Sequence, residues 1–104
     1  MDKKEITPEQ IQQWKQKHGD VYRISVAGDS GETHTGYFRK PSRKTVGYAA
    51  MAGKDNPVRF TEALMQDCWL GGDESLRTDD SLFLSAGAKL AELVQVKEAE
   101  LEKL

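Results

Sequence analysis

The sequence predicts a small α+β domain, in which an N-terminal helix, a two-stranded antiparallel hairpin and three further helices share one core. With 104 residues the chain can bury one modest hydrophobic core. Residues 20–40 alternate apolar and polar side chains around a Gly/Asp/Ser turn, which is the pattern of a hairpin. The flanking stretches carry apolar residues at helical spacing between start and stop signals. We therefore expect a single domain over 1–104, with the N-terminal helix in 1–19, the hairpin in 20–40 and a helical part in 42–104.

The first helix is predicted by its two ends. Thr7 is a plausible cap, Pro8 suits the first helical position, and Gly19 lies where a helix would stop. Ile11 and Trp14 fall on one face between them, so this helix should pack through that face.

The hairpin has one apolar face. Tyr22, Ile24 and Val26 alternate with polar residues, and a second β-prone run ends at Tyr37 and Phe38. Two strands alone are marginal in water, so this face needs cover from the helices. The helices expected to provide it carry Phe60, Leu64 and either Trp69 or Leu90. The residues expected to be buried in the core are Phe60, Leu64, Cys68 and Leu90.

Two more helices follow the hairpin. Pro41 stops the second strand, and Ser42 is expected to cap a short helix that ends near Gly53. Asn56 and Pro57 then supply the cap and first position of the next helix.

The stretch "CWLGGDES", residues 68–75, raises the question of a reactive thiol. Phe60, Leu64 and Cys68 recur every four residues, so Cys68 should face the core. Gly71 or Gly72 is expected to close the helix in a left-handed conformation. At the C-terminal end of a helix the dipole raises the pKa of a thiol, so we predict a structural cysteine and not a nucleophile.

The last helix is expected to open at the "TDD" of residues 78–80 and to continue to the C-terminus. An apolar stripe supports it, although Lys97 interrupts that stripe. Its members are Leu90, Leu93, Val94, Leu101 and Leu104. Two interpretations of the charged end remain open, namely a solvated helix end or a stem that pairs with another subunit.

Composition excludes several classes of protein. The 15 Lys and Arg residues against 17 Asp and Glu give a formal charge of −2, so the whole chain does not attract nucleic acid or an anionic membrane. The sequence has neither an apolar run of membrane-spanning length nor a leader-like start, and its lone cysteine suits a reducing compartment. We expect a cytoplasmic protein with no membrane partner.

No motif for catalysis, metal or cofactor binding is present. His18 and His34 lie in different predicted elements without metal-ligand spacing, and the acidic loop "GGDESLRTDD" lacks the alternating carboxylates of a calcium loop. Gly71 and Gly72 follow a helix, whereas a phosphate-binding loop follows a strand. We therefore expect a protein that is not an enzyme and has no catalytic residue, no metal and no cofactor.

A basic corner lies around one predicted helix start. Its four cations oppose the helix dipole, which favours negative charge at that end. They are Arg39, Lys40, Arg43 and Lys44. The corner is either a solvated surface or a binding patch for a phosphate or an acidic protein segment. With Tyr37 and Phe38 as stacking residues, it would also suit a small nucleic-acid-binding module.

The order of these landmarks resembles that of small proteins encoded by bacterial phages and prophages, particularly tail assembly chaperones. The resemblance covers residues 20–104 and rests on a hairpin ending in "YFRKPSRKTVGYAAM", then "PVRFTEALMQDCWLGGDE", then "DDSLFLSAGAKLAELVQVKEAELEKL". These are landmarks of fold and not catalytic signatures. The N-terminal helix with Trp14 has no clear place in the pattern.

The resemblance implies a non-enzymatic protein that binds phage tail proteins transiently, such as the tape measure or the tail tube subunit. From the residues themselves we expect the partner surface to combine the basic corner with the exposed end of the last helix. Its members are Arg39, Lys40, Arg43, Lys44, Leu101 and Leu104. A homo-oligomer is a further expectation, and the alternative function is nucleic-acid binding by residues 39–44.

Overall fold

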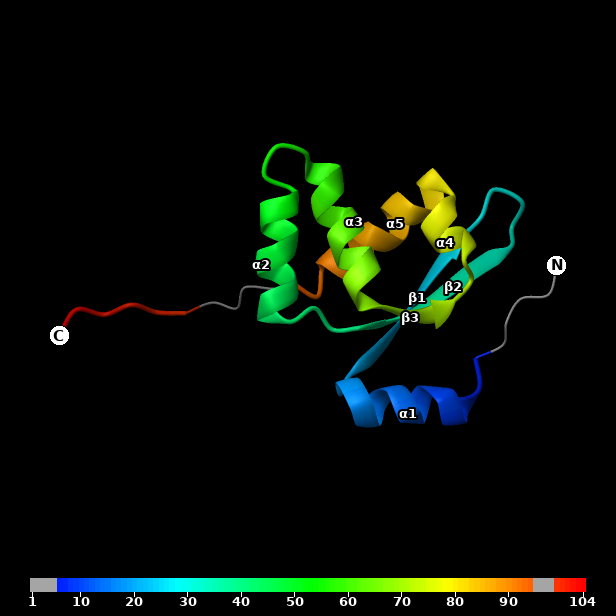
Figure 1. Cartoon of the computed structure of the whole chain (residues 1–104), viewed down its shortest axis with the longest axis horizontal. Helices are drawn as coiled ribbons and strands as arrows, with labels where there is room; N and C mark the ends of the chain where they lie inside the picture. Colours follow the sequence, from blue (N-terminus) through cyan, green and yellow to red (C-terminus); the bar gives the residue numbers. More distant parts are fainter. Residues whose placement is uncertain (1–5, 95–98) are drawn as a thin grey trace.

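A three-stranded antiparallel sheet lies between helix α1 on one side and a layer of helices on the other, in the part of the chain that is described (Figure 1). The computed structural model describes residues 6–94 and 99–104. The predicted α+β class, with an N-terminal helix and a hairpin, is confirmed. In chain order the elements are α1 (Pro8–His18), β1 (Val21–Ala27), β2 (Thr33–Arg39), α2 (Arg43–Ala52), α3 (Pro57–Cys68), β3 (Trp69–Gly72), α4 (Ser75–Thr78) and α5 (Asp80–Ala91).

The predicted helix starts and the first helix stop are confirmed. The side-chain oxygens of Thr7, Ser42 and Asn56 each accept a backbone N–H bond in the first turn of α1, α2 and α3, at 3.0 to 3.1 Å. Gly19 ends α1 with φ at +84°, a left-handed value that glycine adopts without steric penalty. Local sequence signals therefore place these helix ends correctly.

The hairpin forms as expected but gains a third strand. β1 pairs with β2 from Val21 opposite Arg39 to Ala27 opposite Thr33. β3 pairs with the other edge of β2, with a register irregularity between Tyr37 and Phe38. The central strand is therefore β2, and the order is β1-β2-β3.

The prediction that Gly71 or Gly72 closes a helix is wrong. α3 ends at Cys68, and Trp69 turns into extended conformation with φ −62° and ψ 128°. Gly72 lies opposite Gly36 in the sheet, where a Cβ on Gly72 would stand 2.5 Å from the carbonyl oxygen of Thr35. Its φ of +127° is also one that side chains rarely adopt. The two glycines thus serve a close strand approach and not a helix cap.

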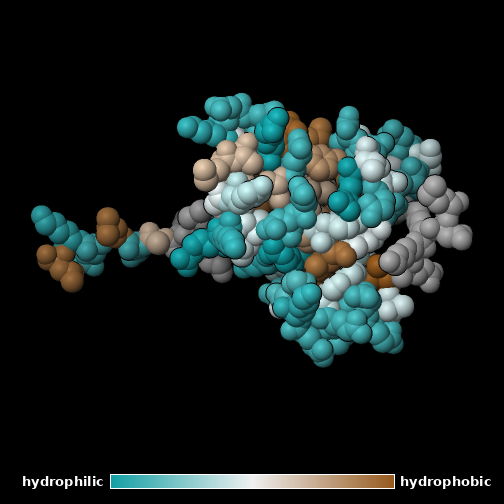
Figure 2. Space-filling view, viewed as in Figure 1, coloured by the Kyte–Doolittle hydropathy of each residue, from teal (hydrophilic) through white to brown (hydrophobic). Residues whose placement is uncertain are grey.

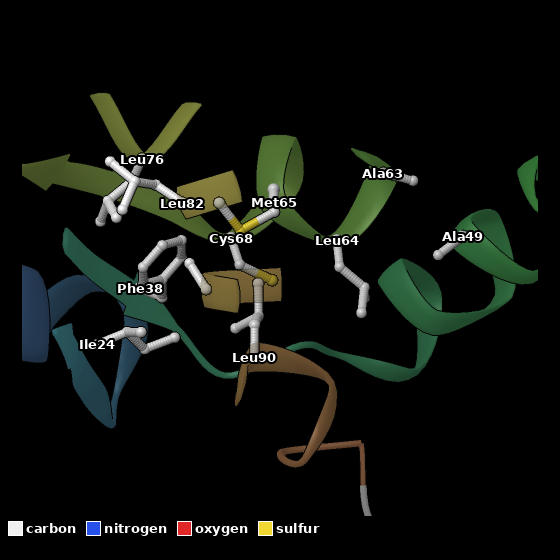
Figure 3. Close-up of a cluster of buried hydrophobic side chains, with 11 residues drawn as sticks. Ile24, Phe38, Ala49, Ala63, Leu64, Met65, Cys68, Leu76, Leu82 and Leu90 are labelled. Atoms are coloured by element: carbon white, nitrogen blue, oxygen red, sulfur yellow. The ribbon is translucent and has the colours of Figure 1, made fainter. Parts of the chain in front are cut away.

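The core lies between the inner face of the sheet and the helical layer (Figure 3). Leu64, Cys68 and Leu90 are fully buried, as predicted. Phe60 was also expected in the core, but it is only partly buried and packs against its side. Phe38 of β2 is fully buried and brings the sheet into the same cluster.

α1 covers the opposite face of the sheet (Figure 1). The ring of Trp14 packs against Tyr37 of β2 with 5.9 Å between centroids. The same indole lies close over β3, where a Cβ on Gly71 would stand 3.1 Å from it. One tryptophan therefore contacts two neighbouring strands.

The last helix is shorter than predicted. α5 ends at Ala91, and residues 99–104 form neither helix nor strand. Leu90 is buried at the end of the body, whereas Leu101 and Leu104 contact no core. A short charged segment without tertiary packing does not sustain a helix, because nucleating one is unfavourable. Lys97, which was expected to interrupt the stripe, lies outside the described residues.

Candidate partner-docking surface

The four cations of the basic corner are brought together at the junction of β2 and α2. Arg39 ends β2, Lys40 lies in the connection, and Arg43 and Lys44 occupy the first turn of α2. Lys40, Arg43 and Lys44 are exposed, whereas the side chain of Arg39 is only 21% exposed. Three of the four cations are therefore available to a partner.

Arg39 has a structural partner inside the fold. Its Nη2 donates to Asp67 Oδ2 at 2.7 Å and to the hydroxyl oxygen of Thr45 at 3.3 Å. Thr45 is buried and donates its own hydroxyl proton to Asp67. The hydrogen bond from Thr45, together with the charge of Arg39, lowers the pKa of Asp67. Because this network joins β2, α2 and α3, we leave Arg39 out of the docking surface.

A groove of about 590 Å³ runs between α2 and α3, and Arg39, Thr45 and Asp67 of this network form part of its lining. Lys44 and Tyr48 of α2 line one side, Gln66 and Asp67 of α3 line the other, and Ala63 also lines it. The groove carries both charge signs and an aromatic edge. These features suit a peptide segment with mixed side chains better than a wholly apolar ligand.

The side of α2 that points to solvent continues this groove as a surface that we call the α2 face. It comprises Arg43, Lys44, Gly47, Tyr48 and Met51, all of them exposed. Tyr48 is 70% exposed and Met51 is 81% exposed, which is high for large apolar side chains. At helical spacing these five positions lie on one side of α2, opposite the buried Thr45 and Ala49.

Sequence reasoning missed Gly47, Tyr48 and Met51. The expected partner surface took only Arg43 and Lys44 from α2, which left Tyr48 and Met51 unassigned. A helix of this length can bury only one side, so apolar residues on two sides are a signal of a second contact surface. The apolar residues on the second side of this helix could therefore have been noticed in the sequence.

Gly47 is the least expected residue on the α2 face. Glycine inside a helix destabilises it by about 0.5–1 kcal/mol relative to alanine. A Cβ at Gly47 would meet nothing within 4 Å, so the packing of the fold does not require glycine there. The missing side chain leaves open space at Gly47 on the exposed surface, and we call this space the notch.

Leu101 and Leu104 are not brought together with the basic corner. They are 101% and 108% exposed, and Figure 1 shows residues 99–104 (red) extending away from the body. Figure 2 shows hydrophobic surface at the end of this projecting segment. The predicted surface is therefore split between the α2 face and a separate extended segment.

A second polar site joins the hairpin to the end of β3. His34 Nδ1 lies 2.7 Å from Asp73 Oδ2, and His34 Nε2 lies 3.2 Å from Glu32 Oε1. Glu32 and His34 line a pocket of about 530 Å³, and Ser75 and Ser81 line it too. A Ser-His-Asp triad needs a serine hydroxyl at the second imidazole nitrogen, where Glu32 lies instead. The geometry favours a structural role, in which His34 joins the hairpin to the residue that follows β3.

Asp73 is held strongly in its charged form. Burial opposes ionisation, but hydrogen bonds from Ser75 and from His34 outweigh it and lower the pKa of Asp73 to about 2. The backbone N–H of Ser75 donates to Asp73 Oδ1 at 2.9 Å. Asp73 therefore anchors both the start of α4 and the imidazole of His34.

Cys68 has the properties of a buried structural residue. Burial raises the pKa of its thiol to about 11, partly offset by the charge of Arg39. At neutral pH the thiol is protonated, and the protonated form is not the nucleophile. Its position inside the core also keeps reagents and substrates away.

Metal-binding and membrane-spanning features can be stated for the described residues. Over 6–94 and 99–104, no group of three His, Cys, Asp or Glu side chains is placed to hold a metal ion. Within the same ranges, the helices fall short of the length and apolarity needed to cross a bilayer.

Comparisons with known proteins support the fold. No protein family and no curated protein matches the sequence. Among solved structures, the uncharacterised protein rbstp2171 from Bacillus stearothermophilus is similar, with a TM-score of 0.61 and 21% sequence identity. The match covers 88% of this chain and 98% of that chain. The two proteins share a fold. At this level of identity the likeness extends to the arrangement of helices and strands and not to a function.

Proposed function

We propose that this protein is a non-enzymatic binding protein of the phage tail assembly chaperone type, and that the α2 face is the surface on which it holds a tail protein. The observation that carries the proposal is the exposure of Tyr48 and Met51 beside the cations of the basic corner. Large apolar side chains ringed by charge are typical of reversible protein contacts, because the apolar centre supplies affinity and the rim supplies orientation.

The class of partner comes from the sequence resemblance. Tail assembly chaperones bind tail proteins transiently during assembly, so the tape measure or the tail tube subunit is the expected partner. A mixed-charge groove next to an aromatic side chain suits a segment of such a protein that is exposed before assembly. Transient binding also agrees with the modest size of the α2 face, since permanent interfaces are larger.

Co-expression with the tape measure and tail tube proteins of the phage or prophage that carries this gene tests the proposal. We expect a complex on size-exclusion chromatography and a higher soluble yield of the bound tail protein. Replacing Arg43→Glu and Lys44→Glu, both on the α2 face, should weaken the complex about ten-fold or more, because two attractive contacts become repulsive.

The matched control is Lys15→Glu with Lys17→Glu. Both lysines are exposed on α1, across the sheet from α2, and the change in net charge is the same. This control should bind like the parent chain. If neither tail protein binds the parent chain, or if both double variants bind equally well, the proposal is wrong.

Nucleic-acid binding is the second candidate, and the position of Tyr48 favours it. Tyr48 lies one helical turn after Lys44, with Arg43 and Lys40 nearby, so a base could stack on the ring while the cations contact phosphates. A titration of a single-stranded oligonucleotide over a range of salt tests this. Binding that falls steeply with salt and is lost in Tyr48→Ala would support the second candidate.

A further inference from the structure

The α2 face carries a notch that a single chain leaves unfilled. The space above Gly47 is open, and the large side chains of Tyr48 and Met51 are exposed on the same face of α2. Stability of the isolated chain would favour alanine over glycine here. An apolar side chain from a second molecule would fit this notch and cover both neighbours.

Residues 99–104 have the complementary chemistry. Glu100 and Glu102 alternate with Leu101, and Leu104 follows, so an acidic segment presents two large apolar side chains. Both leucines are fully exposed, and the segment extends away from its own body (Figure 1). Within one chain, therefore, neither the leucines nor the α2 face is covered.

We propose that residues 99–104 of one copy bind the α2 face of a second copy. A leucine, Leu101 or Leu104, fills the notch at Gly47 against Met51. The glutamates face Lys44, whose charge is of opposite sign. This inference rests on the proposed function, since it names the occupant of the same docking surface when no tail protein is bound.

The exchange is reciprocal, because each copy has both a segment and a face. Two such contacts related by a two-fold axis form a closed dimer. Each contact is short, so the interface is smaller than that of a permanent dimer and the association is weak. A tail protein with a longer apolar segment would displace the exchanged residues, so self-association keeps the α2 face covered until a partner arrives.

Nuclear magnetic resonance with two forms of the full-length chain tests exchange between copies. The labelled acceptor carries Leu101→Ser and Leu104→Ser, so its own segment lacks both leucines. The donor is the unlabelled parent chain, added up to about 1 mM, as a weak contact requires. We expect saturable shifts in the amide signals of residues 43–51 of the acceptor.

Substitutions on the two sides test the details of the contact. Gly47→Gln in the acceptor should weaken binding about ten-fold, because the notch is filled. The same change should raise Tm by about 2–5 °C, which shows that the fold is intact. Ala88→Gln, at an exposed position of α5, is the matched control and should leave binding unchanged.

Charge reversal tests whether Glu100 and Glu102 pair with Lys44. A donor with Glu100→Lys and Glu102→Lys should bind about three-fold more weakly. An acceptor with Lys44→Glu should recover part of this loss with the reversed donor. An acceptor with Lys15→Glu should not recover it, because α1 lies across the sheet.

Three outcomes would overturn the inference. The first is the absence of shifts in residues 43–51 at the highest donor concentration. The second is a difference between parent and Leu101→Ser/Leu104→Ser chains that does not depend on concentration, which would mean docking of a chain's own segment. The third is shifts along residues 21–27 instead, which would mean pairing through β1. The experiment contains no tail protein, so its failure is distinct from failure of the co-expression test and leaves the proposed function standing.

Discussion

At the scale of the residue, two ionisable side chains lie in opposite environments. One lies in the hydrophobic core, and the other lies in the hydrogen-bonded cluster of Glu32, His34 and Asp73. Cys68 loses its charged form because it is buried among apolar side chains, and Figure 3 shows it within the cluster that contains Leu64 and Leu90. Asp73 keeps its charge because donors surround its carboxylate. Each environment leads to a measurable consequence.

Replacing Cys68→Ala should destabilise the fold by about 1 kcal/mol and leave partner binding intact, because the thiol acts as a small buried apolar group. Denaturant unfolding measures the first effect and the co-expression assay the second. In the native parent chain a thiol reagent at pH 8 should react slowly, since the thiol pKa is about 11. Rapid labelling without unfolding would contradict a structural role.

The low pKa of Asp73 links the stability of the fold to pH. Its folded-state pKa of about 2 lies below 3.8, the ordinary pKa of an aspartate side chain. The stabilisation is therefore fully present above about pH 4 to 5 and is lost as the pH falls towards 2. Asp73→Asn should cost about 1.5–3 kcal/mol at pH 7, the usual range for hydrogen bonds to a charged group. Asp73→Asn should also flatten the acid limb of a stability–pH curve, and an unchanged limb would contradict the assignment.

At the scale of the element, Trp14 is one of the residues that attach α1 to the sheet. The indole contacts Tyr37 and lies over Gly71, so truncating it removes packing from β2 and β3 together. Trp14→Ala should destabilise the protein by about 1–3 kcal/mol, less than a fully buried tryptophan because Trp14 is only half-buried. Lys17→Ala, at an exposed position of the same helix, should change stability by less than about 0.5 kcal/mol. Equal effects of the two changes in urea unfolding would show that α1 does not depend on this contact.

Elements defined by local chemistry were predictable, and those defined by distant partners were not. Thr7, Ser42 and Asn56 cap their helices through bonds to residues two or three positions away, so the sequence alone indicates them. β3 exists because Trp69–Gly72 meets β2, which is far away in sequence, and two glycines carry no strand propensity. The end of α5 likewise depends on distant residues, because the helix ends where the rest of the protein no longer provides an apolar surface to pack against.

At the scale of the whole molecule, some features of the candidate site were predictable from local sequence, and others depend on residues far away in the chain. The basic corner is contiguous in sequence and was found, with Lys40, Arg43 and Lys44 exposed as expected. The internal role of Arg39 was not predictable, because Asp67 reaches it from another helix. Leu101 and Leu104 were assigned to the partner surface as part of a helix, whereas they lie on an extended segment.

The position of β3 has a consequence for the order in which the chain assembles. β1 and β2 are joined by a short turn, whereas β2 and β3 are separated by the whole α2–α3 pair. The entropy lost in closing that long loop has to be offset before the pairing of Gly36 with Gly72 contributes any stability. We therefore expect the α2–α3 pair to pack before β3 joins the sheet. The contact between His34 and Asp73 spans the same closure, so we expect it to form late as well.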